Sequence, residues 1–435
     1  DKEFAGWHSS AAVGDRFGDW SLWMGGDHLD NTSHPMTFGN ATRKTTPGAA
    51  GAGTFTVVDS ARLFRDIDTT GQPRIITSSL GIDHTVQEHG KFKVAYDLAP
   101  SVRATYTLGV WQNTSEGSVD SYLRDATGRT IYSAGSTIAN PLKFVRIDGL
   151  DYTVTQAAPS RSESEHWMQG LSLKSNTRGE WDWEAIASDY TQDRDRVRTA
   201  VPTNGYDSGL GAVRAPGTLK IDDGTGWRTL DLRGEWRPGG TLRSAHQVSF
   251  GYHYDRYRLS SDTYNVADWL SGAAGALNSN SKGKTRTTAL YLQDAWRFLP
   301  DWTLVAGGRW EHWQAFDGSN YSAANVAPNP KNLVYGDRSA NAFSPKAMLA
   351  YQASADWTLR GSLGKAYRFP TVSEMFQTYT DASNIKTNDP NLKAEHALAG
   401  ELAAERALAG GLWRTSLFWE DKRDALISQS DTTSV

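Results

Sequence analysis

Apolar and polar residues alternate with a period of two along many segments of the chain. In the segment 302–311 one face carries Trp302, Leu304, Ala306, Gly308 and Trp310, and the other carries Thr303, Val305, Gly307, Arg309 and Glu311. This alternation predicts a β-strand with one apolar and one mostly polar face. Eight residue steps at about 3.3 Å span roughly 26 Å along the strand, so a tilted strand of this length comes close to bilayer thickness.

Similar apolar stripes recur elsewhere in the chain. They are Val102, Ala104, Tyr106, Leu108 and Val110; Val248, Phe250, Tyr252 and Tyr254; and Trp357, Leu359, Gly361, Leu363 and Tyr367, the last interrupted only by Lys365. Aromatic residues at the ends of such stripes are typical of the interfacial girdles of membrane proteins. The same alternation also occurs in half-buried strands of soluble sandwiches, so the pattern alone leaves both architectures open.

The connections between the alternating segments differ sharply in length. Seven are tight: 14–18, 99–101, 177–180, 238–241, 299–301, 353–356 and 407–411. Long polar stretches lie between them, at 31–79, 117–165, 193–226, 260–284, 317–341 and 377–393. Seven hairpins make fourteen strands, and short turns that alternate with long loops favour an outer-membrane barrel, whose long loops all face the exterior.

Composition narrows the class of protein further. The 435 residues include 17 Trp, 17 Tyr, 41 Gly and no Cys. The mean hydropathy of -0.54 and the absence of any run of 18 apolar residues exclude transmembrane helices, whereas barrel strands average out as polar. A net charge of -4 without a basic cluster argues against nucleic-acid binding. The sequence therefore predicts an all-β, transmembrane, antiparallel up-and-down β-barrel.

The fourteen expected strands do not suffice for a closed barrel of the larger kind. The sequence starts at Asp1 without a leader and stops at Val435 in a polar segment, without a closing strand. Since an open sheet edge is not tolerated in lipid, we expect residues 1–435 to be part of a longer barrel or to be completed by a partner. An export signal is expected to lie outside this sequence.

No enzyme or metal motif has the spacing that its chemistry requires. His84 to His89 does not follow a zincin order, Gly48 to Gly53 has no following helix, and the acidic stretch from Asp66 lacks the Glu that closes a calcium loop. We therefore expect no catalytic activity, no metal site and no cofactor.

The polar faces of the strands carry charges that suit a water-filled lumen. They are Arg103, Arg233, Glu235, Arg309, Glu311 and Arg360. Close to the long-loop ends, the same phase places five candidate ligand-binding residues inward: Trp111, His253, Tyr257, Trp313 and Arg368. Aromatic rings stack on planar ligands and Arg pairs with anionic ones. A bulge that shifts the register by one residue would instead turn Trp111 and Trp313 into the outer girdle.

Three stretches of the chain resemble the barrel of TonB-dependent receptors, in family order and spacing. Residues 288–313 (TALYLQDAWRFLPDWTLVAGGRWEHW) are similar to an aromatic hairpin of that family. Residues 343–346 (FSPK) and 364–376 (GKAYRFPTVSEMF) match its Arg-Phe-Pro-x-x-x-Glu-x-Phe segment, and 391–395 (NLKAE) takes the place of its Asn-Leu-Lys-Pro-Glu. Residues 13–38 are a weaker match to an early hairpin. On this mapping Arg368 belongs to a structural motif.

The resemblance implies a 22-stranded barrel around an N-terminal plug, of which this chain would hold about strands 2 to 15. The plug with its TonB-coupling box would precede Asp1, and the remaining strands would follow Val435. It implies a monomeric receptor in the bacterial outer membrane that contacts lipid, couples to TonB and imports an extracellular ligand. Ferric siderophores are the commonest ligand class; cobalamin, haem, another metal chelate, a saccharide or a small redox cofactor are alternatives.

Two other functions remain open at the level of the sequence. A passive porin-like or adhesin-like barrel would need the same wall but no energy coupling. A soluble all-β binding module, such as a sandwich or a propeller, would show the same alternation with its apolar faces packed in a dry interior.

Overall fold

The computed structural model describes residues 4–426 except 36, 45–54, 69–70, 136–141, 155–157, 202–204, 207–214, 242–243, 325–330, 381–384, 388 and 390. Within these residues the long strands are β1 (Gly6–Phe17), β2 (Trp20–Thr32), β6 (Pro73–Ala99), β7 (Val102–Ser121), β10 (Ser160–Ser175), β11 (Trp181–Ala200), β13 (Gly226–Trp236), β14 (His246–Val266), β15 (Leu277–Leu299), β16 (Trp302–Ser322), β18 (Arg338–Gln352), β19 (Trp357–Arg368), β22 (Glu395–Leu408) and β23 (Gly411–Arg423).

Shorter elements lie between the long strands. They are β3 (Thr37–Arg43), β4 (Phe55–Val57), the 3-10 turn Ser60–Arg62, β5 (Phe64–Ile67), β8 (Phe144–Ile147), β9 (Leu150–Val154), β12 (Gly217–Ile221), β17 (Asn332–Val334), α1 (Val372–Phe376), β20 (Thr378–Thr380) and β21 (Ile385–Thr387). No helix in the described part of the chain is long and apolar enough to cross a membrane.

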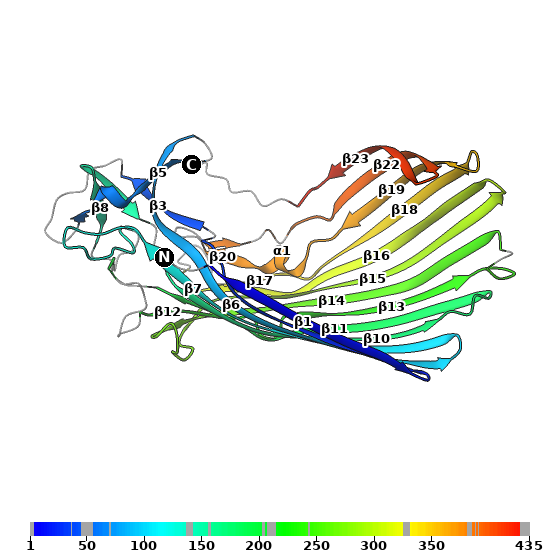
Figure 1. Cartoon of the computed structure of the whole chain (residues 1–435), viewed down its shortest axis with the longest axis horizontal. Coiled ribbons are helices and arrows are strands. Elements are labelled where there is room, and N and C mark those ends of the chain that lie inside the picture. Colours follow the sequence, from blue (N-terminus) through cyan, green and yellow to red (C-terminus); the bar gives the residue numbers. More distant parts are fainter. Residues whose placement is uncertain are drawn as a thin grey trace.

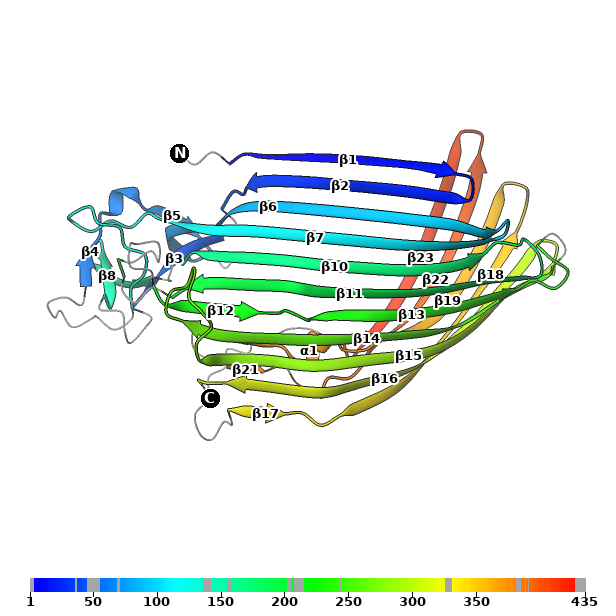
Figure 2. The ribbon, with the colours of Figure 1, turned by 90° about the horizontal axis from the view of Figure 1, so that it is seen from below.

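The long strands form one continuous up-and-down antiparallel series. Each pairs with the next in the order β1, β2, β6, β7, β10, β11, β13, β14, β15, β16, β18, β19, β22, β23. The series curls into a trough, with β1 and β23 at its two edges (Figures 1 and 2). The described part of the chain thus contains the predicted seven hairpins and fourteen strands.

The two ends of the trough differ as the connection lengths predict. The tight turns all lie at one end, on the right of Figure 2, and the longer segments lie at the other. In the first hairpin the turn falls at Gly18 and Asp19, with Gly18 at a φ of +59° that an L side chain rarely adopts. By the logic of outer-membrane barrels, the end with the tight turns is periplasmic and the other end is exterior.

The first two long connections between barrel strands form an ordered unit with its own apolar core. The described residues of 37–67 and 121–154 pack together at the exterior end, around a core of Val58, Ile75, Leu123, Ile131, Ala134, Leu142, Val145, Ile147 and Val154. Strands β4 and β8 pair in parallel within this unit. The sequence shows these stretches only as long and polar, because their apolar residues are spaced irregularly and bury one another only after the segments meet.

The position of α1 identifies the concave face of the sheet. The helix lies inside the trough in Figure 1, and its Val372, Met375 and Phe376 form a buried cluster with Leu259 and Trp313. Residues that share the phase of Leu259 or Trp313 on their strands therefore face inward. The inward phase includes Arg309 and Glu311, as the sequence predicts. In the structure these two side chains form an ion pair of 2.8 Å.

The convex face is apolar and uncovered in the described residues. Leu290 and Leu292 are 57% and 58% exposed, and Phe250, Leu359 and Trp310 are exposed on the same face. No second layer of described residues packs on them, which excludes the sandwich alternative. An apolar face of this extent is unfavourable in water but suits lipid.

Candidate ligand-binding site

Six aromatic and imidazole side chains line up across the concave face, near the middle of most of the strands that carry them. We call this set the inner aromatic row: His89, Trp111, His166, Tyr190, Trp227 and Tyr257. They come from the consecutive strands β6, β7, β10, β11, β13 and β14. Cross-strand pairing places His89 opposite Trp111, Trp111 opposite His166, Tyr190 opposite Trp227, and Trp227 opposite Tyr257. Tyr257 shares its face of β14 with Leu259, so the row faces inward.

The rings from Trp111 to Tyr257 form a continuous contact series. The Trp111 and His166 ring centroids are 4.9 Å apart, and those of His166 and Tyr190 are 5.6 Å apart in an edge-on arrangement. Tyr190 and Trp227 stack at 4.0 Å with 15° between their planes, and Trp227 lies 6.1 Å from Tyr257. Trp227 and Tyr257 are each 38% exposed. The row therefore presents ring surface to the lumen, where a planar ligand can stack.

Hydrogen bonds hold the imidazole of His166 in one orientation. Its Nε2 lies 3.0 Å from Asp195 Oδ2, and its Nδ1 lies 2.6 Å from the hydroxyl oxygen of Tyr190. A neutral imidazole with its proton on Nε2 satisfies both contacts, because Nε2–H donates to the carboxylate and the tyrosine hydroxyl donates to Nδ1. The ring is thereby fixed beside Trp111 without the need for a ligand.

The β6 end of the row is polar. His89 Nδ1 lies 3.0 Å from Asp27 Oδ2, and His8 Nε2 lies 3.5 Å from Asp27 Oδ1. These side chains offer hydrogen-bond donors and acceptors next to the stacked rings. No group of His, Cys, Asp and Glu among the described residues has the geometry of a metal site. The arrangement can bind a ligand by stacking and hydrogen bonding.

The structure brings two of the five sequence candidates into one surface. Trp111 and Tyr257 both belong to the inner aromatic row, so the bulge that would have moved Trp111 to the outer girdle does not occur at its position. His253 lies on the same face of β14, four residues toward the periplasmic end. Its Nδ1 is 2.6 Å from Asp231 Oδ1 and its Nε2 is 3.2 Å from Asp255 Oδ2, so both nitrogens are engaged within the wall.

Trp313 and Arg368 are inward-facing but lie in contacts with the protein itself. Trp313 is 3% exposed, and its ring stacks on Phe369 at 5.6 Å with 3° between the planes. The Arg368 guanidinium lies 3.0 Å from Glu374 and 3.6 Å from Glu395. Their role as ligand contacts stays a prediction, and the observed contacts assign both a part in holding α1 against the wall.

Helix α1 is seated on the wall by Phe376. The Phe376 ring occupies the space that side chains at Gly283 on β15 and Gly318 on β16 would fill, and its centroid lies 5.6 Å from that of Tyr335. Both glycines lack a Cβ at the point of contact, so the ring approaches the backbone of two strands. The stretch after Arg368 is therefore anchored to the inner wall below the exterior opening.

A capping box starts α1. The Thr371 side chain accepts a hydrogen bond from the Glu374 backbone N–H, and the Glu374 carboxylate accepts one from the Thr371 N–H at 2.8 Å. Burial works to raise the pKa of Glu374, but the hydrogen bonds from Thr371 and the Arg368 guanidinium outweigh it and lower that pKa below its usual value. The ionised carboxylate thus holds the start of the helix and Arg368 together.

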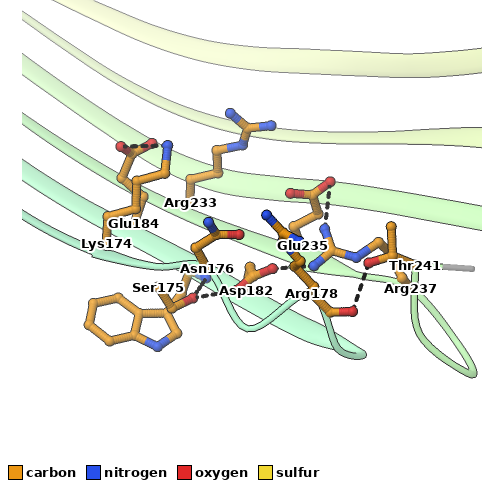
Figure 3. Close-up of a pocket in the computed structure, with 11 residues that line it drawn as sticks. Lys174, Ser175, Asn176, Arg178, Asp182, Glu184, Arg233, Glu235, Arg237 and Thr241 are labelled. Carbon is orange, nitrogen blue, oxygen red and sulfur yellow. Dashed lines mark hydrogen bonds and ion pairs between the residues drawn. The ribbon is translucent and has the colours of Figure 1, made fainter. Parts of the chain in front are cut away.

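A second polar surface lies on the inner wall at the periplasmic end, around a pocket of about 300 Å³ (Figure 3). Asp182 accepts hydrogen bonds from Ser175 Oγ at 2.8 Å and from Arg237, and Arg237 lies 3.0 Å from Glu235. These contacts join the turn after β10 to the end of β13. Arg233 projects beside them, and Figure 3 marks no ion pair between Arg233 and the other residues that line the pocket. This surface offers charges to whatever occupies the lumen.

The sequence reasoning missed the members of the row between Trp111 and Tyr257. His166, Tyr190 and Trp227 have the inward phase on their strands, and that alternation was the available signal. Their contact depends on the register of four strand pairs and on a bulge between Glu165 and His166, which a single sequence does not reveal.

Comparisons with known proteins agree with this architecture. A family model described as "TonB dependent receptor-like, beta-barrel" matches residues 105–435. The ferric enterobactin receptor of Pseudomonas aeruginosa is 23% identical over 268 residues, which cover 58% of this chain and 32% of that protein. The chain thus spans about a third of the length of that curated relative.

Solved structures share the fold along nearly the whole chain. The ferric yersiniabactin uptake receptor FyuA from Yersinia pestis aligns with a TM-score of 0.53 and 13% identity, over 97% of this chain and 53% of that one. FpvA of Pseudomonas aeruginosa, solved with a heterologous pyoverdine and iron, aligns with a TM-score of 0.55 and 12% identity, over 96% and 47%. The chain spans about half of each of these proteins.

Proposed function

Because the chain belongs to the family of TonB-dependent receptor-like β-barrels, we propose that the complete protein binds an extracellular ferric siderophore and imports it into the periplasm with energy delivered by TonB. The family places the chain in the bacterial outer membrane, and it is a family of receptors and transporters rather than of enzymes. Import of this kind breaks and forms no covalent bond, so the proposal requires no catalytic residue.

The observation that carries the proposal is the inner aromatic row. It crosses six consecutive strands of the wall, it faces the lumen, and it lies near the middle of most of these strands. The hydrogen-bonded His166 and the stacked Tyr190 and Trp227 are fixed before any ligand binds. Preorganised rings lose little conformational entropy on binding, which favours affinity.

Two observations support a ferric siderophore as the ligand: the side-chain chemistry of the inner aromatic row and the names of the similar proteins. Many siderophores carry aromatic rings and several hydrogen-bonding groups, and both features suit the row and the neighbouring Asp27 and His89. The names of the relatives connect them to ferric enterobactin, ferric yersiniabactin and pyoverdine. Cobalamin, haem, other metal chelates, saccharides and small redox cofactors are the alternatives that a ligand panel has to exclude.

Energy coupling requires a closed barrel and a segment that binds TonB, and we place both in the complete protein. Strand β1 pairs with β2 alone and β23 with β22 alone among the described residues. Since lipid does not tolerate an open edge, we propose that further strands close the barrel in the complete protein and that a plug carrying the TonB-binding segment occupies its lumen. The charged surface around Arg233 and Glu235 at the periplasmic end suits contact with such a polar plug.

Whole-cell uptake tests the proposal directly. Cells that lack other siderophore receptors and produce the full-length protein are given ⁵⁵Fe-loaded enterobactin, pyoverdine or yersiniabactin, with and without a protonophore. We expect one of these chelates to accumulate only in energised cells. Accumulation that continues unchanged after the inner membrane is de-energised would refute the importer and support a passive barrel.

Two substitutions test whether the inner aromatic row binds the imported ligand. Trp227→Ala and Tyr257→Ala are expected to raise the Kd of the imported chelate at least ten-fold in binding assays on intact cells, because each removes an exposed ring of the row. The matched control is Trp310→Ala, which removes an exposed ring from the lipid face of β16. Equal affinities for all three variants would remove the row from the binding site.

A further inference from the structure

A group of basic side chains lies on the lipid-facing side of three adjacent strands, on the exterior side of their apolar stripes. We call it the outer basic cluster: Arg228 on β13, Arg256 and Arg258 on β14, and Lys284 and Arg286 on β15. Each has the same phase as exposed apolar residues on its strand, for example Leu232, Phe250 and Leu290. The cluster therefore faces away from the lumen and cannot contact an imported ligand.

The register places these like charges directly opposite one another. Arg228 pairs with Arg256, Arg256 pairs with Arg286, and Arg258 pairs with Lys284. Like charges at directly opposed cross-strand positions destabilise a sheet unless a counter-charge is present. An arrangement of five cations on three strands thus indicates an anion that is external to the protein wall.

The protein neutralises only part of this charge. Arg228 lies 2.6 Å from Asp189, and Lys284 lies 2.6 Å from Asp317. Arg286 donates to the amide oxygen of Gln314, which carries no charge. Arg256 and Arg258 are exposed, and neither forms an ion pair with any carboxylate in the described part of the chain. Two guanidinium groups therefore remain available to an anion.

Three cations of the cluster lie around the ring of Phe316. The guanidinium carbons of Arg256 and Arg286 each lie 5.7 Å from the centroid of the Phe316 ring, and Lys284 Nζ lies 6.0 Å from it. The ring comes from β16, so the cluster bridges four strands. An aromatic ring beneath converging cations holds them close together while the charges stay open to the outside.

The cluster begins where the apolar stripe ends. On β14 the stripe runs through Phe250, Tyr252 and Tyr254, and Arg256 is the next residue on that face. A basic residue just beyond an interfacial aromatic lies at the height of the lipid headgroups. At the corresponding positions β6, β7 and β10 carry Glu88, Gln112 and Glu165, so these three strands present no positive charge at that height.

We propose that the outer basic cluster binds the phosphate groups of a phosphorylated glycolipid in the external leaflet of the outer membrane. Two unpaired guanidinium groups match phosphate oxygens in geometry and charge, and arginine forms bidentate contacts with them. The bound lipid neutralises the opposed charges on β13, β14 and β15 and fixes the height of this wall in the membrane. The proposal is independent of which ligand the barrel imports.

The test measures lipid retained by the full-length protein after purification in detergent. The probe is bis-phosphorylated lipid A, and binding is quantified by native mass spectrometry and by phosphorus analysis. The double variant Arg256→Ser with Arg258→Ser is expected to retain at least ten-fold less lipid A than the unmodified protein. The matched control, Lys91→Ser with Lys93→Ser, removes two charges from the concave face and is expected to retain lipid A fully.

Further arms separate the lipid from other sources of phosphate. Lipid A stripped of its phosphates is expected to bind the unmodified protein no better than it binds the double variant. Millimolar inorganic phosphate is expected not to displace intact lipid A from the unmodified protein. The conservative variant Arg256→Lys with Arg258→Lys keeps the charge and is expected to retain an intermediate amount. Equal retention by the unmodified protein and the serine variant, equal loss in the control, or full displacement by inorganic phosphate would each overturn the proposal.

Discussion

Phe376→Ala is expected to release α1 from the inner wall while leaving the barrel strands in place. Phe376 is 2% exposed, and its ring fills the space above Gly283 and Gly318. Truncation of a fully buried Phe to Ala costs about 3 to 5 kcal/mol, because the transfer free energy is lost and a cavity remains. The neighbours on this face are strand backbone, which cannot collapse into the cavity, so we expect the upper part of that range.

Hydrogen exchange of the α1 amides measures this loss. The backbone N–H groups of Met375 and Gln377 donate to Thr371 and Ser373 at 3.0 and 2.9 Å, so both are protected while the helix is seated. Since each 1.4 kcal/mol is a factor of ten, protection is expected to fall by roughly two to three and a half orders of magnitude. Amides in β15 and β16 are expected to keep their protection.

The matched control is Phe64→Ala. Phe64 is exposed on β5 at the exterior end, so its truncation is expected to change α1 protection less than two-fold. The reasoning is refuted if Phe376→Ala leaves the protection of the α1 amides within three-fold of the unmodified protein, or if the strands lose protection to the same extent as the helix.

The remaining predictions concern the cap, the two faces of the wall and the glycine at the α1 seat. Because the pKa of Glu374 is lowered in the folded protein, its contribution to α1 is present above the unfolded value and is lost as pH falls through the folded one; α1 protection should be constant from pH 5 to 8 and drop below about pH 4, whereas Glu374→Gln should lower it between pH 5 and 8 and remove the drop at low pH. Leu292→Arg should destabilise the barrel in lipid by about 2 to 4 kcal/mol in denaturant titrations, whereas Gln293→Arg, one residue away on the inner face, should be tolerated; similar losses in both would contradict the assignment of faces. Gly318→Val should place a side chain where the Phe376 ring lies and expose α1 to protease at an enzyme concentration that leaves the unmodified protein intact; unchanged cleavage would show that the ring does not depend on that space.

Much of the wall could be predicted from local patterns. The seven hairpins follow from turn residues between alternating segments, and the phase of Leu304, Leu359 and Phe250 determines their lipid-facing side, since successive side chains in a strand point to opposite faces. The same phase places Trp111, His253, Tyr257, Trp313 and Arg368 inward. A period of two is a property of each strand alone, so it requires no knowledge of neighbouring strands.

The candidate site was predictable only in part. Trp111 and Tyr257 were named without the residues that connect them, because the contacts of His166, Tyr190 and Trp227 arise from register across several strand pairs. Trp313 was named as a candidate ligand contact, and the sequence did not predict that its ring stacks on Phe369. The five-residue helix α1, which follows Phe369, packs against Gly283 and Gly318. These glycines lie more than fifty residues earlier in the chain, so no local pattern predicts the contact.

The sequence by itself determined the strand count, the sidedness of each strand and the end at which the long segments lie, because these depend on residues that are adjacent in the chain. Tertiary structure alone decided which side chains meet: the inner aromatic row, the seat of α1 and the opposed arginines of the outer basic cluster. The physical reason is that pairing register and sheet curvature are set by the summed contacts of whole strands, so a one-residue slip would preserve the alternating pattern and still separate every one of these groups.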